Sequence, residues 1–110
     1  MFAYPVPKNY QWYPSVWGGD KVLWVGASSY TGPVLIRGRR LDRNYFVRFG
    51  NAHNPSPELH LTVTRALSPT WQGREWPSTT RLRAPGCYGY QVDGTTFTEV
   101  IVFRAGIYAK

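Results

Sequence analysis

The clearest pattern in this chain is an alternation of apolar and polar residues over positions 58–65. Leu59, Leu61 and Val63 fall on one face of an extended segment. The opposite face carries Glu58, His60, Thr62 and Thr64. A period of two residues with one apolar face predicts an antiparallel strand that is half covered and half solvated.

Shorter apolar runs predict further strands over residues 21–27, 34–37 and 45–49. They are separated by a Gly-Pro turn at 32–33, a charged connector at 39–44, and loops at 51–57 and 68–78. Many short strands with regular turns are typical of sandwiches and small barrels. We therefore predict an all-β fold, an antiparallel β-sandwich of about seven strands, with a small β-barrel as the alternative.

The C-terminal residues 80–105 predict two strands joined by Asp93-Gly94. This dipeptide between β-prone runs favours a two-residue hairpin with a type I′ turn. In the first strand Tyr88, Tyr90 and Val92 share a face. The second, residues 97–103, is apolar on both faces near its end, so we expect it to be central or covered by the aromatic N-terminal segment.

The same segment carries a family resemblance. Pro85-Gly86, a strand bearing Tyr88, and the closing hairpin resemble the final strand pair of immunoglobulin-like and fibronectin-III-like sandwiches, including those of uncharacterised exported bacterial proteins. The resemblance implies an immunoglobulin-like strand arrangement. It also implies that the Tyr88 hydroxyl bonds to upstream backbone as a tyrosine corner. A second cysteine, and with it an inter-sheet disulfide, is absent from the sequence.

Residues 1–20 form an aromatic arm rich in proline and glycine, ahead of a sandwich domain at 21–110. Neither strand nor helix periodicity holds in the arm. Its candidate docking residues are Phe2, Tyr4, Tyr10, Trp12, Tyr13 and Trp17. One hypothesis is that the arm docks on a neighbouring subunit. The other is that it covers an open face of its own sandwich.

The chain has a net charge of +7, and ten of its 13 cationic residues are arginine. The candidate ligand-binding cations are Arg37, Arg39, Arg40, Arg43 and Arg48, with Tyr45 and Phe46 among them. We expect Gly38 to break the strand within this run. The cluster suits nucleic acid, an anionic polysaccharide or an acidic protein patch, and its plainer interpretation is a solvated connector.

A second candidate site is the loop at 68–78, which carries Trp71, Arg74 and Trp76. Exposed tryptophans can stack on sugar rings. The alternative is that these rings fold back onto the edge of the sandwich.

Catalysis and metal binding have little support. Cys87 is expected to be a small buried residue, and the only histidines are His53 and His60. Neither a nucleophile–base motif nor the ligand spacing of a metal site is present. We therefore predict no enzyme activity, cofactor or metal. The sequence also has no apolar run long enough for a transmembrane segment.

These features predict a non-catalytic binding or assembly module of an exported or cell-surface protein. A protein partner or self-assembly is the favoured interaction. A carbohydrate-binding module and a basic nucleic-acid-binding domain are the alternatives. Met1 is either the start of a cytoplasmic protein or a start that replaces a removed signal peptide. A cytoplasmic location is therefore the alternative to an exported one.

Overall fold

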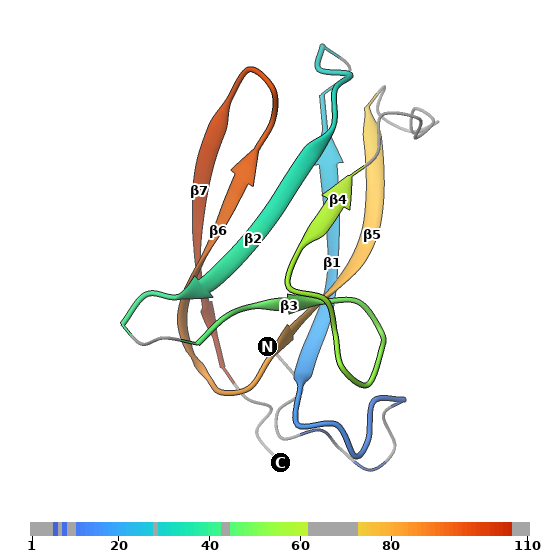
Figure 1. The fold of residues 1–110 in the computed structure, drawn as a ribbon, viewed down its shortest axis with the longest axis vertical. Helices are drawn as coiled ribbons and strands as arrows, with labels where there is room; N and C mark the ends of the chain where they lie inside the picture. The colour runs from blue at the N-terminus through green and yellow to red at the C-terminus, as the bar shows by residue number, and fades with distance from the viewer. Residues whose placement is uncertain are drawn as a thin grey trace.

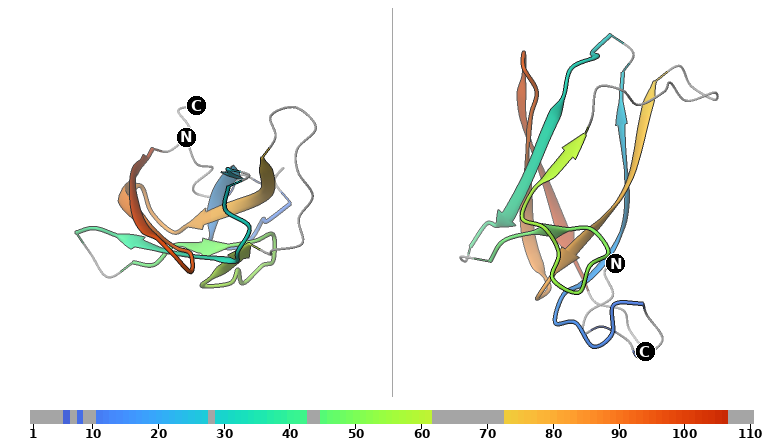
Figure 2. Two further views of the ribbon diagram at one scale, coloured as in Figure 1. Left: turned by 90° about the horizontal axis from the view of Figure 1, so that it is seen from above. Right: turned by 45° about the vertical axis from the view of Figure 1, so that its right-hand side comes forward.

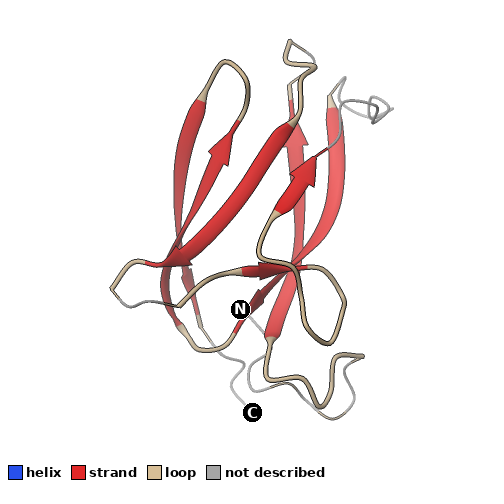
Figure 3. Cartoon of the chain, in the orientation of Figure 1, coloured by secondary structure: helices blue, strands red, loops and turns tan. Residues whose placement is uncertain are grey.

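The computed structural model describes residues 6, 8, 11–27, 29–42, 45–61 and 73–106. The regular elements of this part of the chain are all strands (Figures 1 and 3). They are β1 (Gly18–Gly26), β2 (Val34–Arg40), β3 (Arg48–Phe49), β4 (Leu59–Leu61), β5 (Arg74–Leu82), β6 (Gly86–Asp93) and β7 (Thr98–Ala105). The prediction of an all-β fold with about seven strands is confirmed.

The strands form two antiparallel sheets, in the order β1-β5-β3 and β4-β2-β6-β7. Seen from above, β2 and β4 lie in one layer and β1 and β5 in the other, while β7 curves round one side (Figure 2). This is the two-layer arrangement of a β-sandwich. Because β1 begins at Gly18, the first strand includes the last residues of the predicted arm.

Inward-facing residues of both sheets make the core. Val34 and Ile36 of β2 and Tyr88 and Tyr90 of β6 alternate into it, as the period of two requires. The Tyr90 ring packs edge-on against Trp24 of the other sheet, with centroids 4.9 Å apart. In β4, Leu61 is buried and His60 is exposed, so the predicted alternation is confirmed there. Residues 62–65 of that predicted strand lie outside the described residues.

Two tyrosine hydroxyls fix the core to backbone and to the facing sheet. Tyr88 is 1% exposed, and its hydroxyl donates to the Ala84 carbonyl at 2.6 Å, which is the contact that the tyrosine corner implied. The Tyr90 hydroxyl lies 2.7 Å from the Thr80 hydroxyl. Burial raises the pKa of Tyr90 to about 12, although this hydrogen bond opposes the shift.

A buried arginine holds the described part of the arm against the sandwich. Arg81 of β5 is fully buried, and its guanidinium donates to the carbonyls of Trp17, Gly50 and Ala52 at 2.6–3.0 Å. It also lies 4.4 Å from the ring centroid of Trp12. Its charge is therefore solvated by backbone carbonyls and an aromatic face, and burial lowers its pKa.

The closing hairpin exists, but its predicted turn is wrong. The β6–β7 ladder ends at the pair Asp93–Thr98, so residues 94–97 form a four-residue loop. The Gly94 N–H donates to the Phe97 carbonyl at 2.9 Å. The Phe97 ring packs edge-on against the Tyr30 ring, with their centroids 4.9 Å apart, and also contacts the core. This tertiary packing outweighs the local preference for a two-residue turn.

The expectation that Gly38 breaks its strand is also wrong, since β2 continues through it to Arg40. A side chain at Gly38 would lie 2.9 Å from Val47. Glycine therefore lets Val47 pack directly on the strand, and the Val47 N–H donates to the Gly38 carbonyl. The predicted strand at 45–49 is mostly a crossing segment: it bridges Arg39 at Phe46 and joins β5 only at β3.

The prediction that the last strand is central or covered is wrong. β7 is an edge strand of its sheet. Val100, Ile101 and Val102 are 67%, 43% and 62% exposed, so apolar side chains reach solvent on both faces. An exposed edge strand and a buried central strand can have the same apolar sequence pattern. Only the order of strands in the sheet distinguishes the two.

Candidate binding surface

The candidate site is the outer face of the sheet β4-β2-β6-β7. The ladder places Arg37 beside Gln91, and Gln91 beside Val100. One row further along, Arg39 lies beside Gly89, and Gly89 beside Val102. Because alternate residues point to opposite faces, these two rows lie opposite the core.

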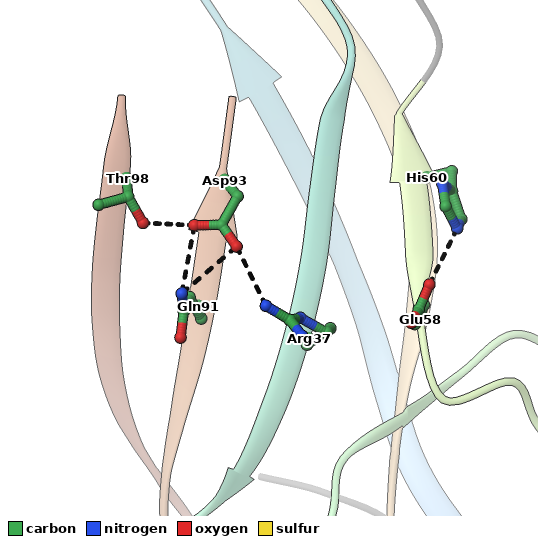
Figure 4. Close-up of polar contacts among 6 residues, drawn as sticks. All are labelled: Arg37, Glu58, His60, Gln91, Asp93 and Thr98. Carbon is green, nitrogen blue, oxygen red and sulfur yellow. Dashed lines mark hydrogen bonds and ion pairs between the residues drawn. The ribbon is translucent and has the colours of Figure 1, made fainter. Parts of the chain in front are cut away.

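A carboxylate network occupies one end of this face (Figure 4). Asp93 accepts a short hydrogen bond from the Thr98 hydroxyl, two from the Gln91 amide at 3.3 Å, and one from Arg37 at 3.3 Å. The Thr98 and Gln91 hydrogen bonds lower the pKa of Asp93, and Arg37 adds to the shift. Asp93 was expected to serve the turn, whereas it holds the end of the strand pair and one arginine.

Between this network and the crossing segment lies a groove of about 660 Å³. Leu41, Phe46 and Val100 supply apolar side chains, and those of Leu41 and Val100 lie close to the buried Gly89 at its floor. The complete lining is Arg37, Gly38, Arg39, Leu41, Phe46, Arg48, Pro57, Glu58, Gly89, Tyr90, Gln91 and Val100. The groove therefore combines three arginines and one carboxylate with exposed apolar side chains.

The fold brings together three of the predicted cations and separates the others. Arg37, Arg39 and Arg48 line the groove. Arg40 points to the opposite face of β2 and pairs with Asp42 at 2.7 Å. Arg43 lies outside the described residues.

The prediction that residues 68–78 form a loop is wrong in part. Arg74 and Trp76 lie in strand β5 of the other sheet, where Trp76 is paired with Trp24 and packs against the core. Arg74 donates to the Tyr30 carbonyl at 3.2 Å. Trp71 lies outside the described residues. Arg74 and Trp76 are thus on a different sheet from the arginine groove.

The described aromatics of the arm contact their own domain. Trp12 is 6% exposed and lies against Arg81. Trp17 lies between Arg48 and Arg83, whose guanidinium carbons are 5.2 and 5.5 Å from its ring centroid. Tyr13 is 47% exposed. Three candidate docking residues, Phe2, Tyr4 and Tyr10, lie outside the described residues.

Sequence reasoning missed the groove's apolar walls and its glycine floor. Phe46 was noted only as an aromatic near the arginines, and Leu41 and Val100 were not singled out. The missing signal is the register: only the pairing of Arg39 with Gly89 and of Gly89 with Val102 shows that these segments share one face.

The groups that sequence reasoning weighed for catalysis lie apart. Cys87 is exposed on β6, contrary to the expectation that it is buried. His60 is on β4 and pairs with Glu58 at 3.2 Å. The register places His60 in the row of Leu35 and Asp93, six residues along β6 from Cys87. This corresponds to roughly 20 Å along the strand, too far for a Cys–His hydrogen bond.

In the described ranges, no three His, Cys, Asp or Glu side chains are placed to hold a metal ion together. The same part of the chain contains no helix of the length and apolar character needed to cross a membrane. Comparison of the chain with protein-family models, curated proteins and solved structures finds no match.

Proposed function

We propose that this protein is a non-catalytic assembly module that associates with a second copy by pairing of their β7 strands. The supporting observation is the exposed apolar centre of an edge strand, at Val100, Ile101 and Val102. The outer edge of such a strand presents backbone N–H and C=O groups for pairing with another chain.

β7 has few of the features that usually prevent an edge strand from pairing with another chain. Proteins block such edges with charges, prolines or bulges. Glu99 and Arg104 are the charged residues of β7, and they flank its centre without interrupting it. The strand is neutral within a chain of charge +7, so two copies repel each other less at this edge than over the rest of the surface.

Antiparallel pairing of two β7 strands keeps both sandwiches on the same side of the joined sheet. A register centred on Ile101 places Val100 of each copy opposite Val102 of the other, so the outer face gains a cluster of four valines. Such an interface is closed by a two-fold axis. A single strand pair buries less than the roughly 1,200 Å² of a small stable interface, so we expect a concentration-dependent dimer.

The test is sedimentation velocity over a concentration series at low and high salt. We expect a monomer–dimer equilibrium that strengthens with salt, because salt screens the repulsion between two copies. Val102→Lys should abolish dimerisation. Asn54→Lys, on an exposed loop, adds the same charge and is the control. A monomer at every concentration, or equal loss in both variants, would refute the proposal.

Cross-linking tests the register. In a Cys87→Ser background, Ile101→Cys should give a covalent dimer on mild oxidation, because it lies at the two-fold axis. Thr98→Cys, near the end of the same strand, should cross-link poorly. Val25→Lys probes the other possible arrangement, since Val25 is 59% exposed on edge strand β1. Loss of association in that variant would indicate that β7 of one copy pairs with β1 of the next. Such pairing joins two different surfaces and does not form a closed two-fold dimer, so this result would reject the symmetric dimer.

A further inference from the structure

We propose that the groove over Gly89 binds an acidic peptide segment of a partner protein, with one carboxylate held by Arg39 and Arg37 and neighbouring apolar side chains on Phe46, Leu41 and Val100. The groove shares Val100 with the outer face of β7, but its arginines, Leu41 and Phe46 lie on other segments. Peptide binding therefore does not require dimerisation.

The positive charge of the groove is concentrated on one strand. Arg37 and Arg39 are two residues apart on the outer face of β2, which corresponds to about 7 Å along the strand. Arg39 is exposed, and no ion pair engages it among the described residues. Arg37 is 51% exposed in its pair with Asp93, and an exposed pair of this kind is weak enough to exchange partners.

The exposed apolar side chains of the groove favour a ligand that also carries apolar groups. Phe46 and Leu41 are each 53% exposed, and Val100 is 67% exposed. A side chain added at Gly89 would lie 3.2 Å from Leu41 and 3.8 Å from Val100. The Leu41 and Val100 side chains therefore lie close over the glycine and, with Phe46, offer an apolar surface beside the arginines. Carboxylate and apolar side chains on one extended ligand are the chemistry of an acidic peptide.

The surrounding carboxylates disfavour a polyanion. Glu58 lines the groove and Asp93 lies on the same face beside Arg37. Nucleic acids and sulfated glycans carry a charge on every unit, so a strand long enough to fill the groove would bring negative charges against these two carboxylates. A single acidic residue between apolar residues avoids this repulsion. The other cation of the groove, Arg48, also donates to the Pro55 carbonyl and contacts Trp17.

The probe is the peptide Gly-Phe-Asp-Leu-Gly with blocked ends and a neutral fluorophore. Its matched control has Asn in place of Asp. We expect saturable binding in fluorescence anisotropy, with the Asn peptide about tenfold weaker, which corresponds to about 1.4 kcal/mol. Binding should weaken modestly with salt, as expected for one charge contact, whereas dimerisation should strengthen.

The protein variants locate the site. Arg39→Gln should weaken binding about two- to fivefold, the range for loss of one partly exposed charge contact. Lys21→Gln, exposed on the other sheet, makes the same charge change and should leave binding intact. Peptide binding should persist at protein concentrations too low for dimerisation, which separates failure of this proposal from failure of the assembly proposal.

Several results would overturn the peptide site. Equal binding of the Asp and Asn peptides would show that the arginines do not bind the peptide carboxylate. Equal effects of Arg39→Gln and Lys21→Gln would mean that only net charge matters. Tighter, Arg39-dependent binding of oligo-dT or heparin, with a steep salt dependence, would identify a polyanion site instead.

Discussion

The most direct test of the fold's organisation is replacement of the buried arginine. Arg81→Met keeps a long unbranched side chain but removes the whole guanidinium. Five hydrogen bonds end on that group, four at backbone carbonyls and one at the Ser15 hydroxyl. The variant therefore leaves buried acceptors without donors and releases the arm from the sandwich.

The expected loss is about 3–5 kcal/mol of the free energy of unfolding. Hydrogen bonds to a charged group contribute about 1.5–3 kcal/mol each, but burying the charge costs several kcal/mol and offsets much of that sum. The net figure matches the loss on removing one partner from a buried charged network. Since small domains are stable by about 5–15 kcal/mol, the variant should be severely destabilised or unfolded.

Arg83→Met is the matched control, because Arg83 is exposed and contacts Trp17 through its guanidinium 5.5 Å from the ring centroid. Losing that contact should cost about 0.5–1 kcal/mol. Arg81→Lys, which keeps the charge and some donors, should fall between the two methionine variants. Urea unfolding followed by circular dichroism measures all three. A loss in Arg81→Met no larger than that in Arg83→Met would refute this account of the arginine.

Two further outcomes follow from the core. The raised pKa of Tyr90, about 12 against its ordinary 10.0, means that the unfolded state loses this proton first as pH rises. Unfolding free energy should therefore fall by about 1.4 kcal/mol per pH unit between those values, and urea titrations of Tyr90→Phe should show a shallower alkaline decline. Gly19→Ala would place a methyl 2.1 Å from the Thr80 carbonyl oxygen, whereas in Gly38→Ala the nearest atom is a Val47 methyl at 2.9 Å. Gly19→Ala should thus lose about 3 kcal/mol or more and Gly38→Ala about 1–3 kcal/mol in the same urea assay; equal losses would contradict this ranking.

Local patterns were sufficient for the class of fold and for several contacts. The alternation around Leu59 and Leu61, and the shared face of Tyr88 and Tyr90, follow from the period of a strand and hold in the structure. The Tyr88 hydroxyl contact was implied by the resemblance of its segment to the last strand pair of immunoglobulin-like sandwiches. These features depend on residues close together in the sequence, where the physics of a strand applies directly.

Local preference failed where distant residues pack against the same segment. Asp93-Gly94 favours a two-residue turn, but Phe97 folds back onto Tyr30 and lengthens the loop. Gly38 has low strand propensity, yet Val47 occupies the space that its missing side chain leaves. In both cases a packing contact outweighs a backbone preference of about 1 kcal/mol or less.

The sequence alone thus determined an all-β chain with a basic surface and an apolar last strand. Only the tertiary structure decided that Arg81 is buried, that Arg37 and Arg39 share a face with Gly89, and that β7 is an edge. The reason is that strand order and register are set by packing between segments far apart in the chain. The same apolar run can be a buried strand or an exposed edge, and only its neighbours distinguish the two.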